Sequence, residues 1–141
     1  MIVLDVNVLI AAFREDHAHH ILARPWLINI FAAESAVVIP DFVWVGFVRI
    51  VTNSHIFEVP STLDEAFGFV AALTESPAYR SVPGIAGGLR LFEDVSREAG
   101  ASANLVSDAY IAAVARSLAC PVGSFDRDFR RFTGVELVMP G

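Results

Sequence analysis

Short apolar runs alternate with longer stretches at helical spacing along the whole chain, and this alternation restricts the possible folds more than any other feature. Strands are expected at residues 2–4, 37–39, 79–82, 121–125 and 135–138, and helices at 7–13, 19–33, 41–52, 61–75 and 85–99. A further helix, capped by Asn104 or Ser107, should precede the fourth strand. Strands that alternate with helices form a mainly parallel sheet between helical layers. We therefore predict one α/β domain over residues 1–141, a three-layer α/β/α sandwich with four to five short strands.

Three aspartates stand at the ends of these expected elements rather than on solvated faces. Asp5 follows the first strand, Asp126 follows the fourth with Asp128 two residues further on, and Asp108 lies where the last long helix opens. The carboxyl ends of parallel strands line one crevice, so Asp5 and Asp126 would be neighbours if their strands are adjacent. Asp108 would then face them. Each aspartate could alternatively be only a turn former or a helix cap.

A cluster of carboxylates needs positive charge among its members, because like charges within a few ångströms repel and raise one another's pKa. Oxygen ligands without His or Cys suit a hard divalent cation such as Mg²⁺ or Mn²⁺. Such a cation supports phosphodiester hydrolysis, because it neutralises phosphate charge and lowers the pKa of the attacking water. We therefore predict a metal site formed by Asp5, Asp108 and Asp126.

The net charge limits how the chain could hold a nucleic acid. Ten basic residues, all of them arginine, face sixteen acidic residues, which gives a net charge of −6 and argues against a broad electrostatic hold on a polyanion. A nucleic acid would need a metal ion and a local basic patch, for which the candidates are Arg49, Arg127, Arg130 and Arg131. These arginines could equally be solvated charges that pair with nearby acids.

Cysteine content and hydropathy indicate the compartment. Cys120 is the single cysteine, so an intrachain disulfide is impossible and the reducing cytoplasm is expected. The apolar N-terminus lacks a basic segment and is interrupted by Asp5 and Asn7, which argues against a signal peptide. No apolar run approaches the roughly 20 residues of a membrane span, so no membrane association is expected. Apolar residues still make up 55% of the chain, which indicates either a full core or apolar surface covered by a partner.

Several polar or irregular positions are open to two interpretations. Asn7 most simply caps the first helix, although it could also bond the preceding carboxylate. His17, His19 and His20 favour a solvated helix start over a zinc site, because no further His or Cys ligand stands nearby in sequence. Pro25 should kink or restart the second helix.

Gly46 is out of place inside an apolar helix. A glycine in the middle of a helix costs about 1 kcal/mol relative to alanine, and no turn or cap requires one here. Close packing against a neighbouring element is the simplest structural explanation.

Four segments of the chain together resemble the PIN-domain ribonuclease toxins of the VapC type. They are residues 1–10 (MIVLDVNVLI), residues 38–53 with VIP, FVR and VTN, residues 104–109 (NLVSDA), and residues 124–132 (SFDRDF followed by Phe132). Each segment alone is weak evidence, whereas the four in this order and at this spacing cover nearly the whole chain and are specific.

The resemblance implies a PIN-like fold and a Mg²⁺- or Mn²⁺-dependent endoribonuclease that cleaves cellular RNA and is held inactive by a VapB-type antitoxin. It assigns the family's acids to Asp5, Asp108 and Asp126, with Asp128 as an auxiliary, and we also expect a homodimer. The family's remaining acid, a glutamate, falls on Gly46, so the activity could be reduced. A branch of the family often carries a small residue here, and we therefore expect this chain to retain metal-dependent cleavage.

Two other functions stay open at this stage. One is a catalytically inactive PIN-fold module that binds antitoxin or RNA. The other is a metal-dependent phosphoryl-transfer enzyme, which also places acids at strand ends. Enzymes and receiver domains of that kind would want an acid where Asn7 stands or a lysine late in the chain, and this chain contains no lysine.

Overall fold

The computed structural model describes residues 1–85 and 87–141, and a sheet of five parallel strands forms its centre. The strands lie in the order β3-β2-β1-β4-β5, so the first strand of the chain occupies the middle. Within this sheet, Val3 of β1 pairs with Val38 on one side and with Val122 on the other. The strands are β1 (Ile2–Leu4), β2 (Val37–Val38), β3 (Tyr79–Arg80), β4 (Val122–Gly123) and β5 (Leu137–Val138).

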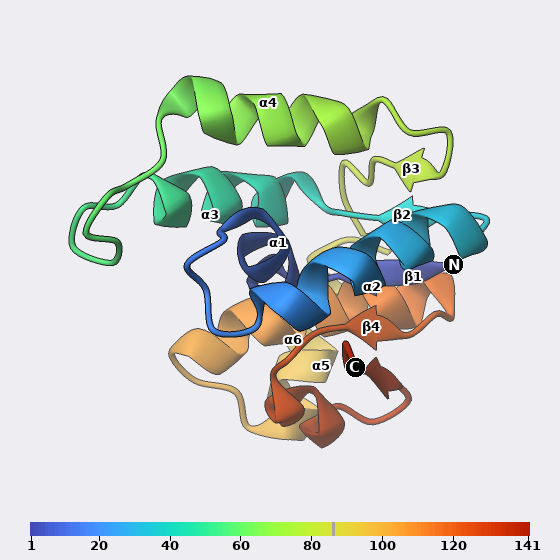
Figure 1. Cartoon of the computed structure of the whole chain (residues 1–141). Coiled ribbons are helices and arrows are strands. Elements are labelled where there is room, and N and C mark those ends of the chain that lie inside the picture. The colour runs from blue at the N-terminus through green and yellow to red at the C-terminus, as the bar shows by residue number, and fades with distance from the viewer. Residues whose placement is uncertain (86) are drawn as a thin grey trace.

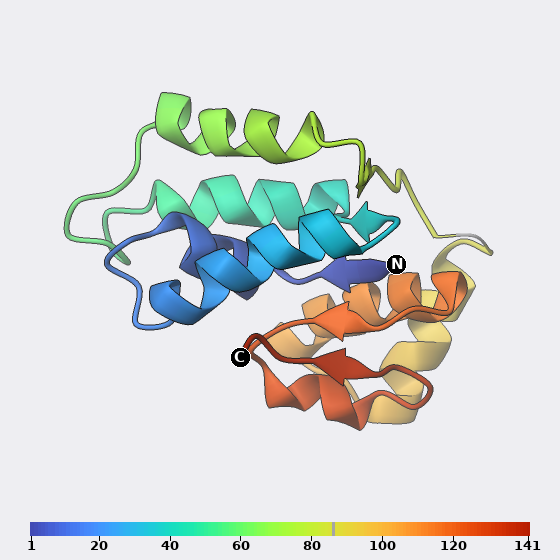
Figure 2. The same cartoon turned by 45° about the vertical axis from the view of Figure 1, so that its right-hand side comes forward.

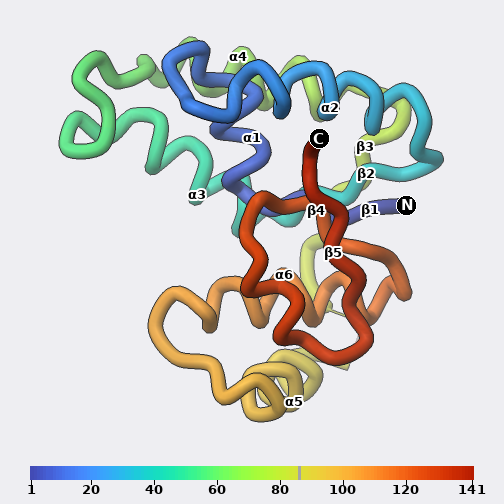
Figure 3. The backbone as a smooth tube through the Cα atoms, turned by 60° about the horizontal axis from the view of Figure 1, so that its bottom comes forward, coloured from blue at the N-terminus to red at the C-terminus, as the bar shows by residue number. Residues whose placement is uncertain are grey.

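Helices cover both faces of the sheet. Figures 1 and 3 show α1 to α4 on one face, and α5, α6 and the short 3-10 helix η1 on the other. Their bounds are α1 (Val6–Phe13), α2 (His20–Ala33), α3 (Asp41–Val51), α4 (Leu63–Thr74), α5 (Leu89–Ala99), α6 (Asn104–Leu118) and η1 (Arg127–Arg131). In the part of the chain that the structure describes, no helix has both the length and the apolar character to cross a membrane. The predicted α/β/α sandwich is confirmed, with five strands that are all parallel.

Two helices differ from their expected course. α5 begins at Leu89 rather than at residue 85, because Gly87 and Gly88 have φ angles of +88° and +67°, which a right-handed helix does not accept. Residue 86, which falls in the expected helix, lies outside the described residues. α2 is not restarted at Pro25, which lies within one continuous helix. Pro25 is exposed, so water can bond the carbonyl that the missing N–H leaves free.

The path of the chain creates a crevice beside β1. From β1 the chain moves outward to β2 and β3, then crosses through α5 and α6 to β4 on the other side of β1, and ends in β5. Figure 2 shows β4 and β5 side by side, next to α6. In open parallel sheets, ligands bind at the carboxyl ends of the strands where the strand order reverses. Here that point lies between β1 and β4, which places Asp5 and the residues after Gly123 on its two sides.

Aromatic side chains join three helices on the α1 to α4 face. The buried ring of Phe47 lies 5.4 Å from the ring of Phe13 and 5.2 Å from that of Phe69, measured between centroids. Trp44, also on α3, contacts Phe47 edge to face at 5.9 Å. Aromatic pairs at these separations stabilise beyond the area that they bury. They hold α3 against α1 and α4, and α3 forms one wall of the crevice.

Gly123 allows the crevice strands to close, and replacing it should destabilise the fold. A Cβ at this position would stand 2.8 Å from Leu4 Cδ2 and 2.8 Å from Trp26 Cη2. We expect Gly123→Ala to lower the free energy of unfolding by about 1–3 kcal/mol through overpacking, as measured by urea denaturation. Gly68→Ala on α4 is the matched control, because nothing lies within 4 Å of its Cβ position. The control should be neutral or stabilising, and a Gly123→Ala protein of unchanged stability would contradict this packing.

Candidate active site

Asp5 lies between β1 and α1, where its side chain caps the helix. The residue is only 4% exposed. Its Oδ1 accepts a hydrogen bond from the Val6 backbone N–H at 2.7 Å, and its Oδ2 accepts one from the Ser124 hydroxyl at 2.7 Å. Burial raises the pKa of Asp5, the two hydrogen bonds oppose that rise, and the nearby Asp126 carboxylate adds to it. Because burial is the largest of these effects, the pKa of Asp5 is higher than usual.

Ser124 connects the first strand to the loop after the fourth. It is fully buried, and its Oγ accepts hydrogen bonds from the Asn7 side-chain amide at 3.0 Å and from the Asp126 N–H at 3.0 Å. The Asn7 Oδ1 in turn accepts the N–H of Phe125 at 3.2 Å. The expectation that Asn7 caps the first helix is therefore wrong. Asp5 occupies that position, and Asn7 reaches across to the loop after β4.

The role of Ser124 was not predicted from the sequence, where the residue counts only as part of the segment 124–132. The available signal is a small hydroxyl residue directly after a buried strand and two residues before Asp126. A hydroxyl at such a place can donate to one group and accept from two others at once. Ser124 uses this full capacity, so it positions Asp5 and Asp126 relative to each other.

Asp126 and Asp128 follow β4 in different settings. Asp126 is half-buried and caps η1, since its Oδ1 accepts the Asp128 N–H at 2.8 Å. Asp128 is exposed. Asp5 and Asp126 thus do cap helices, which was the alternative to metal binding for these aspartates. It does not exclude a second role, because a carboxylate offers about four lone-pair sites and capping uses few of them.

Asp108 faces the other carboxylates from α6. A cavity of about 350 Å³ is lined by Asp5, by residues of α3 that include Arg49, and by Asp108. Asp108 is half-buried, and burial, followed by the charges of Asp5, Asp126 and Asp128, raises its pKa to about 7. The charges of Asp5, Asp126 and Asp128 therefore all act on Asp108. A group with this pKa is only partly ionised near neutral pH.

The start of α6 differs from the expected one. Neither Asn104 nor Ser107 caps the helix. Ala103 precedes its first residue, with a φ of +52° and no side-chain cap. Asp108 therefore lies past the first turn rather than at the helix mouth. Asn104 and Ser107 instead line the cavity on the same side as Asp108.

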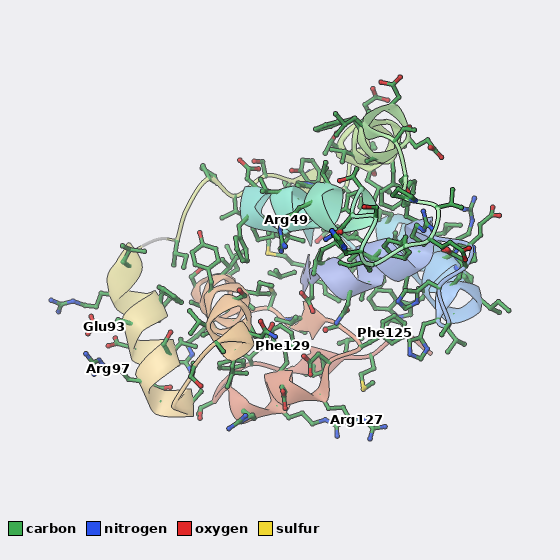
Figure 4. The ribbon with its side chains drawn as sticks, turned by 90° about the vertical axis from the view of Figure 1, so that its left-hand side faces the viewer. Arg49, Glu93, Arg97, Phe125, Arg127 and Phe129 are labelled. Carbon is green, nitrogen blue, oxygen red and sulfur yellow. The ribbon has the colours of Figure 1, made fainter. Side chains whose placement is uncertain are left out.

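The four candidate arginines are not equivalent. Arg49 lines the cavity, and Figure 4 shows its side chain extending from α3 towards α6. Arg127 lies at the outer edge of the protein and points away from it in the same view. Arg130 and Arg131 are exposed on η1 and do not line the cavity. Only Arg49 is thus in a position to meet a group bound between Asp5 and Asp108.

Gly46 also lines the cavity, and close packing does not explain it. A Cβ there would meet only Val6 Cγ2, at the ordinary contact distance of 3.8 Å. The expectation of a tight approach is therefore wrong. A Cβ at this position would fit, on the wall that also carries Arg49.

The chemistry of the donor set fits Mg²⁺ or Mn²⁺, because the charged groups around the cavity that could bind a cation are carboxylates. The ion pairs found in the described residues include none of the four aspartates, so no arginine neutralises them. Across residues 1–85 and 87–141, no three Asp, Glu, His or Cys side chains stand close enough together to hold one metal ion. That Asp5, Asp108 and Asp126 bind a common ion therefore remains a prediction. Mg²⁺ often takes only one or two carboxylates and fills its other positions with water.

The histidines near residue 20 form no metal site either, within the described residues. His20 Nδ1 instead lies 2.9 Å from the carbonyl oxygen of Ala11, a hydrogen bond that holds the start of α2 against α1. His17 and His20 are partly buried and only His19 is exposed, so this helix start is not simply solvated.

Removing the ionisable group at position 108 should stabilise the metal-free protein near neutral pH. The pKa of Asp108 is about 7 in the folded state, against roughly 3.9 in an unfolded chain. Between these values the folded state binds more protons than the unfolded state, so the stability contributed by this group falls as the pH rises from about 4 to 7. In the presence of a chelator, we expect the stability of Asp108→Asn to fall less than that of wild type as the pH rises. Above pH 7 its Tm should be higher than that of wild type.

Thermal unfolding followed by circular dichroism across the pH range measures this difference. Asp94→Asn, at an exposed position on α5, is the matched control and should leave the wild-type profile unchanged. Parallel Tm profiles for wild type and Asp108→Asn would show that the pKa of Asp108 is not raised in the folded protein.

Comparison with known proteins finds similar chains over almost the whole length. A family model of the PIN domain matches residues 2–135. Ribonuclease VapC31 of Mycobacterium tuberculosis is 43% identical over 140 residues, which are 99% of this chain and 99% of that protein. Ribonuclease VapC25 of the same organism is 41% identical over 140 residues, again 99% of each. A solved structure of VapBC2 from Rickettsia felis, bound to a DNA fragment from the VapBC2 promoter, also matches this chain. The TM-score is 0.73 at 13% identity, over 100% of both chains, which shows a common fold.

Proposed function

The chain belongs to the PIN-domain family, and from that premise we propose that it is a VapC-type toxin of a type II toxin-antitoxin pair, a metal-dependent endoribonuclease. The family match over residues 2–135 and the relatives named ribonuclease VapC confirm the resemblance inferred from the sequence. For this chain's own site, the main support is that Asp5 and Asp108, from two separate elements, line one cavity, and that the charges of Asp126 and Asp128 act on Asp108 there. Within the described residues, none of these carboxylates forms an ion pair with an arginine. We propose Mg²⁺ or Mn²⁺ as the metal and a cellular RNA as the substrate.

The side chains at the cavity have separate tasks in this proposal. Asp5, Asp108 and Asp126 would hold the divalent ion, which when bound neutralises phosphate charge and lowers the pKa of the attacking water. The Ser124 hydroxyl and the Val6 N–H hold Asp5 in one orientation and favour its ionised form. Asp108, whose pKa is about 7, would lose its proton in order to bind the ion, and metal uptake would then depend on pH near neutrality.

Neutral and basic groups in the cavity wall would hold the RNA. Arg49 is the candidate for a phosphate contact, because it is the one of the four arginines that lines the cavity. Asn104 and Ser107 add an amide and a hydroxyl, which can bond a phosphate or the 2′-hydroxyl that distinguishes RNA from DNA. The exposed arginines of η1 would meet the strand outside the cavity, and these are Arg127, Arg130 and Arg131.

An antitoxin is the partner that the family supports, and we propose one of the VapB type. The match to the VapBC2 structure supports this proposal. A groove of about 390 Å³ lies between α2 and α4, lined by apolar side chains that include Ile28, Phe31 and Phe69. An amphipathic helix can place its apolar face in a groove of this kind.

We also propose that residues 1–141 form one domain and that two copies assemble as a homodimer. Both ends of the chain enter the same sheet, as β1 and β5, which supports one domain. Exposed apolar side chains on α3 and α4 support self-association, because they would otherwise face water: Val45 is 68% exposed, Leu63 60% and Phe67 55%. A monomeric mass in light scattering would contradict the dimer.

An inactive PIN-fold module that binds antitoxin or RNA is the second candidate. Gly46 supports it, since the family resemblance places an acid at this position of the cavity wall. The family match gives no support to a separate class of phosphoryl-transfer enzyme.

Cleavage of RNA should require both the metal and the carboxylates. We expect Asp5→Asn and Asp108→Asn each to lower kcat/KM by at least about 100-fold, because each removes a charge that binds the ion or orients the water. Chelation should abolish cleavage, and added Mg²⁺ or Mn²⁺ should restore it. Asp94→Asn is the control with an unchanged rate. Electrophoresis of labelled RNA gives the rates, and cleavage that survives Asp5→Asn would leave the proposal without support.

A glutamate at position 46 should strengthen the site. The space at Gly46 accepts a Cβ, and the residue lines the cavity that contains Asp5 and Asp108, so a glutamate here would add a carboxylate to it. We expect Gly46→Glu to raise the cleavage rate and to lower the metal concentration that gives half of the maximal rate. Gly46→Gln has the same size without the charge and should do neither. A wild-type protein that is inactive until Gly46→Glu is introduced would favour the inactive module instead.

A further inference from the structure

A stacked pair of aromatic rings lies next to the carboxylates and has no part in the site described above. The imidazole ring of His19 lies over the ring of Phe125, with their centroids 4.6 Å apart and their planes inclined by 16°. Phe125 stands between Ser124 and Asp126 in the chain. Figure 4 shows it on the loop after β4, on the side that faces α1 and α2. Phe125 is thus linked through the chain to Ser124 and Asp126, and neither ring lines the cavity beside Asp5 and Asp108.

Hydrogen bonds hold the backbone that carries each ring. The Phe125 N–H donates to the Asn7 side chain at 3.2 Å. His19 precedes α2, where its carbonyl oxygen accepts the Ala23 N–H at 2.8 Å and its own N–H donates to His17 Nδ1 at 3.0 Å. His19 is nevertheless exposed, and the His17 ring, 5.8 Å away and tilted by 42°, leaves part of the imidazole open to water. A ring that is already ordered loses little entropy when a ligand stacks on it.

We propose, on the basis of the ribonuclease function above, that His19, supported by Phe125, is the stacking platform for an unpaired base of the RNA. Unpaired RNA bases stack on aromatic side chains, histidine included, and such contacts do not depend on a strong positive field. That independence matters here, because a protein with a net charge of −6 gains little from general attraction to RNA. Phe125, which supports the platform, is the chain neighbour of Asp126, so the base on His19 would belong to a nucleotide that flanks the phosphate at the cavity. His19 and Phe125 are positioning residues in this proposal.

Steady-state cleavage of a short single-stranded RNA, selected for cleavage from a random-sequence pool, tests the platform. Loss of a base–aromatic stack costs about 1–3 kcal/mol, which corresponds to a change of about 5- to 150-fold. We therefore expect His19→Ala to raise KM by a factor in this range with little change in kcat. His19→Phe keeps an aromatic face and should behave like wild type. His55→Ala, another exposed histidine in the loop after α3, is the matched control and should have no effect.

Abasic nucleotides placed one at a time along the same RNA identify the stacked base. In wild type, one abasic position should raise KM as much as His19→Ala does, and the two changes together should cost no more than either alone. A structural role of His19 would not produce this coupling. The proposal is overturned if every abasic effect adds fully to that of His19→Ala, or if His19→Phe is as impaired as His19→Ala.

The experiment also separates the platform from the function on which it depends. If wild type cleaves the RNA and His19→Ala leaves KM unchanged, the platform is overturned but the ribonuclease function is not. Wild type that neither cleaves the pool with Mg²⁺ or Mn²⁺ nor binds it with Ca²⁺ overturns both. Circular dichroism and Tm of each variant confirm that the fold is retained.

Discussion

The hydrogen bond from the Ser124 hydroxyl to the Asp5 carboxylate joins residues that are 119 positions apart, and the geometry of the site depends on it. Because Ser124 also accepts from Asn7 and from the Asp126 N–H, one buried oxygen fixes the first strand, the first helix and the loop after the fourth strand. Without such a donor, the free-energy cost of burying the carboxylate would not be offset. The pairing of β1 and β4 makes the contact possible, and Gly123 leaves room beside it for the side chains of Leu4 and Trp26.

The fold gathers like charges where they destabilise it. Burial and mutual repulsion raise the pKa values of Asp5 and Asp108, and no arginine pairs with them in the described residues. An arrangement of this kind is typical of a functional site rather than a structural one, since nothing in the packing of the core requires it. The buried aromatic contacts of α3 with α1 and α4 hold the cavity wall in place against this repulsion.

Much of the fold and the grouping of the acids could be predicted because they depend on local patterns. Apolar periodicity marks the strands and helices, and the rule for parallel sheets then places Asp5 and Asp126 at one edge. Features that depend on distant partners could not be predicted. Asn7 bonds atoms 117 and 118 positions away, so its local appearance as a helix cap was misleading. The start of α6 carries no capping side chain. Gly123 and Gly46 differ only in their surroundings, because a Cβ would clash at position 123 and would make an ordinary contact at position 46.

The order of the strands also determines when the site can exist. β1 leaves the ribosome first, but Asp108, Ser124 and Asp126 lie in the last quarter of the chain, and β4 and β5 complete the sheet beside β1 only then. A nascent chain therefore carries Asp5 without the groups that complete its surroundings until residues 108–126 have been synthesised. For a protein that attacks RNA, this topology delays activity until β4 and β5 have joined the sheet beside β1.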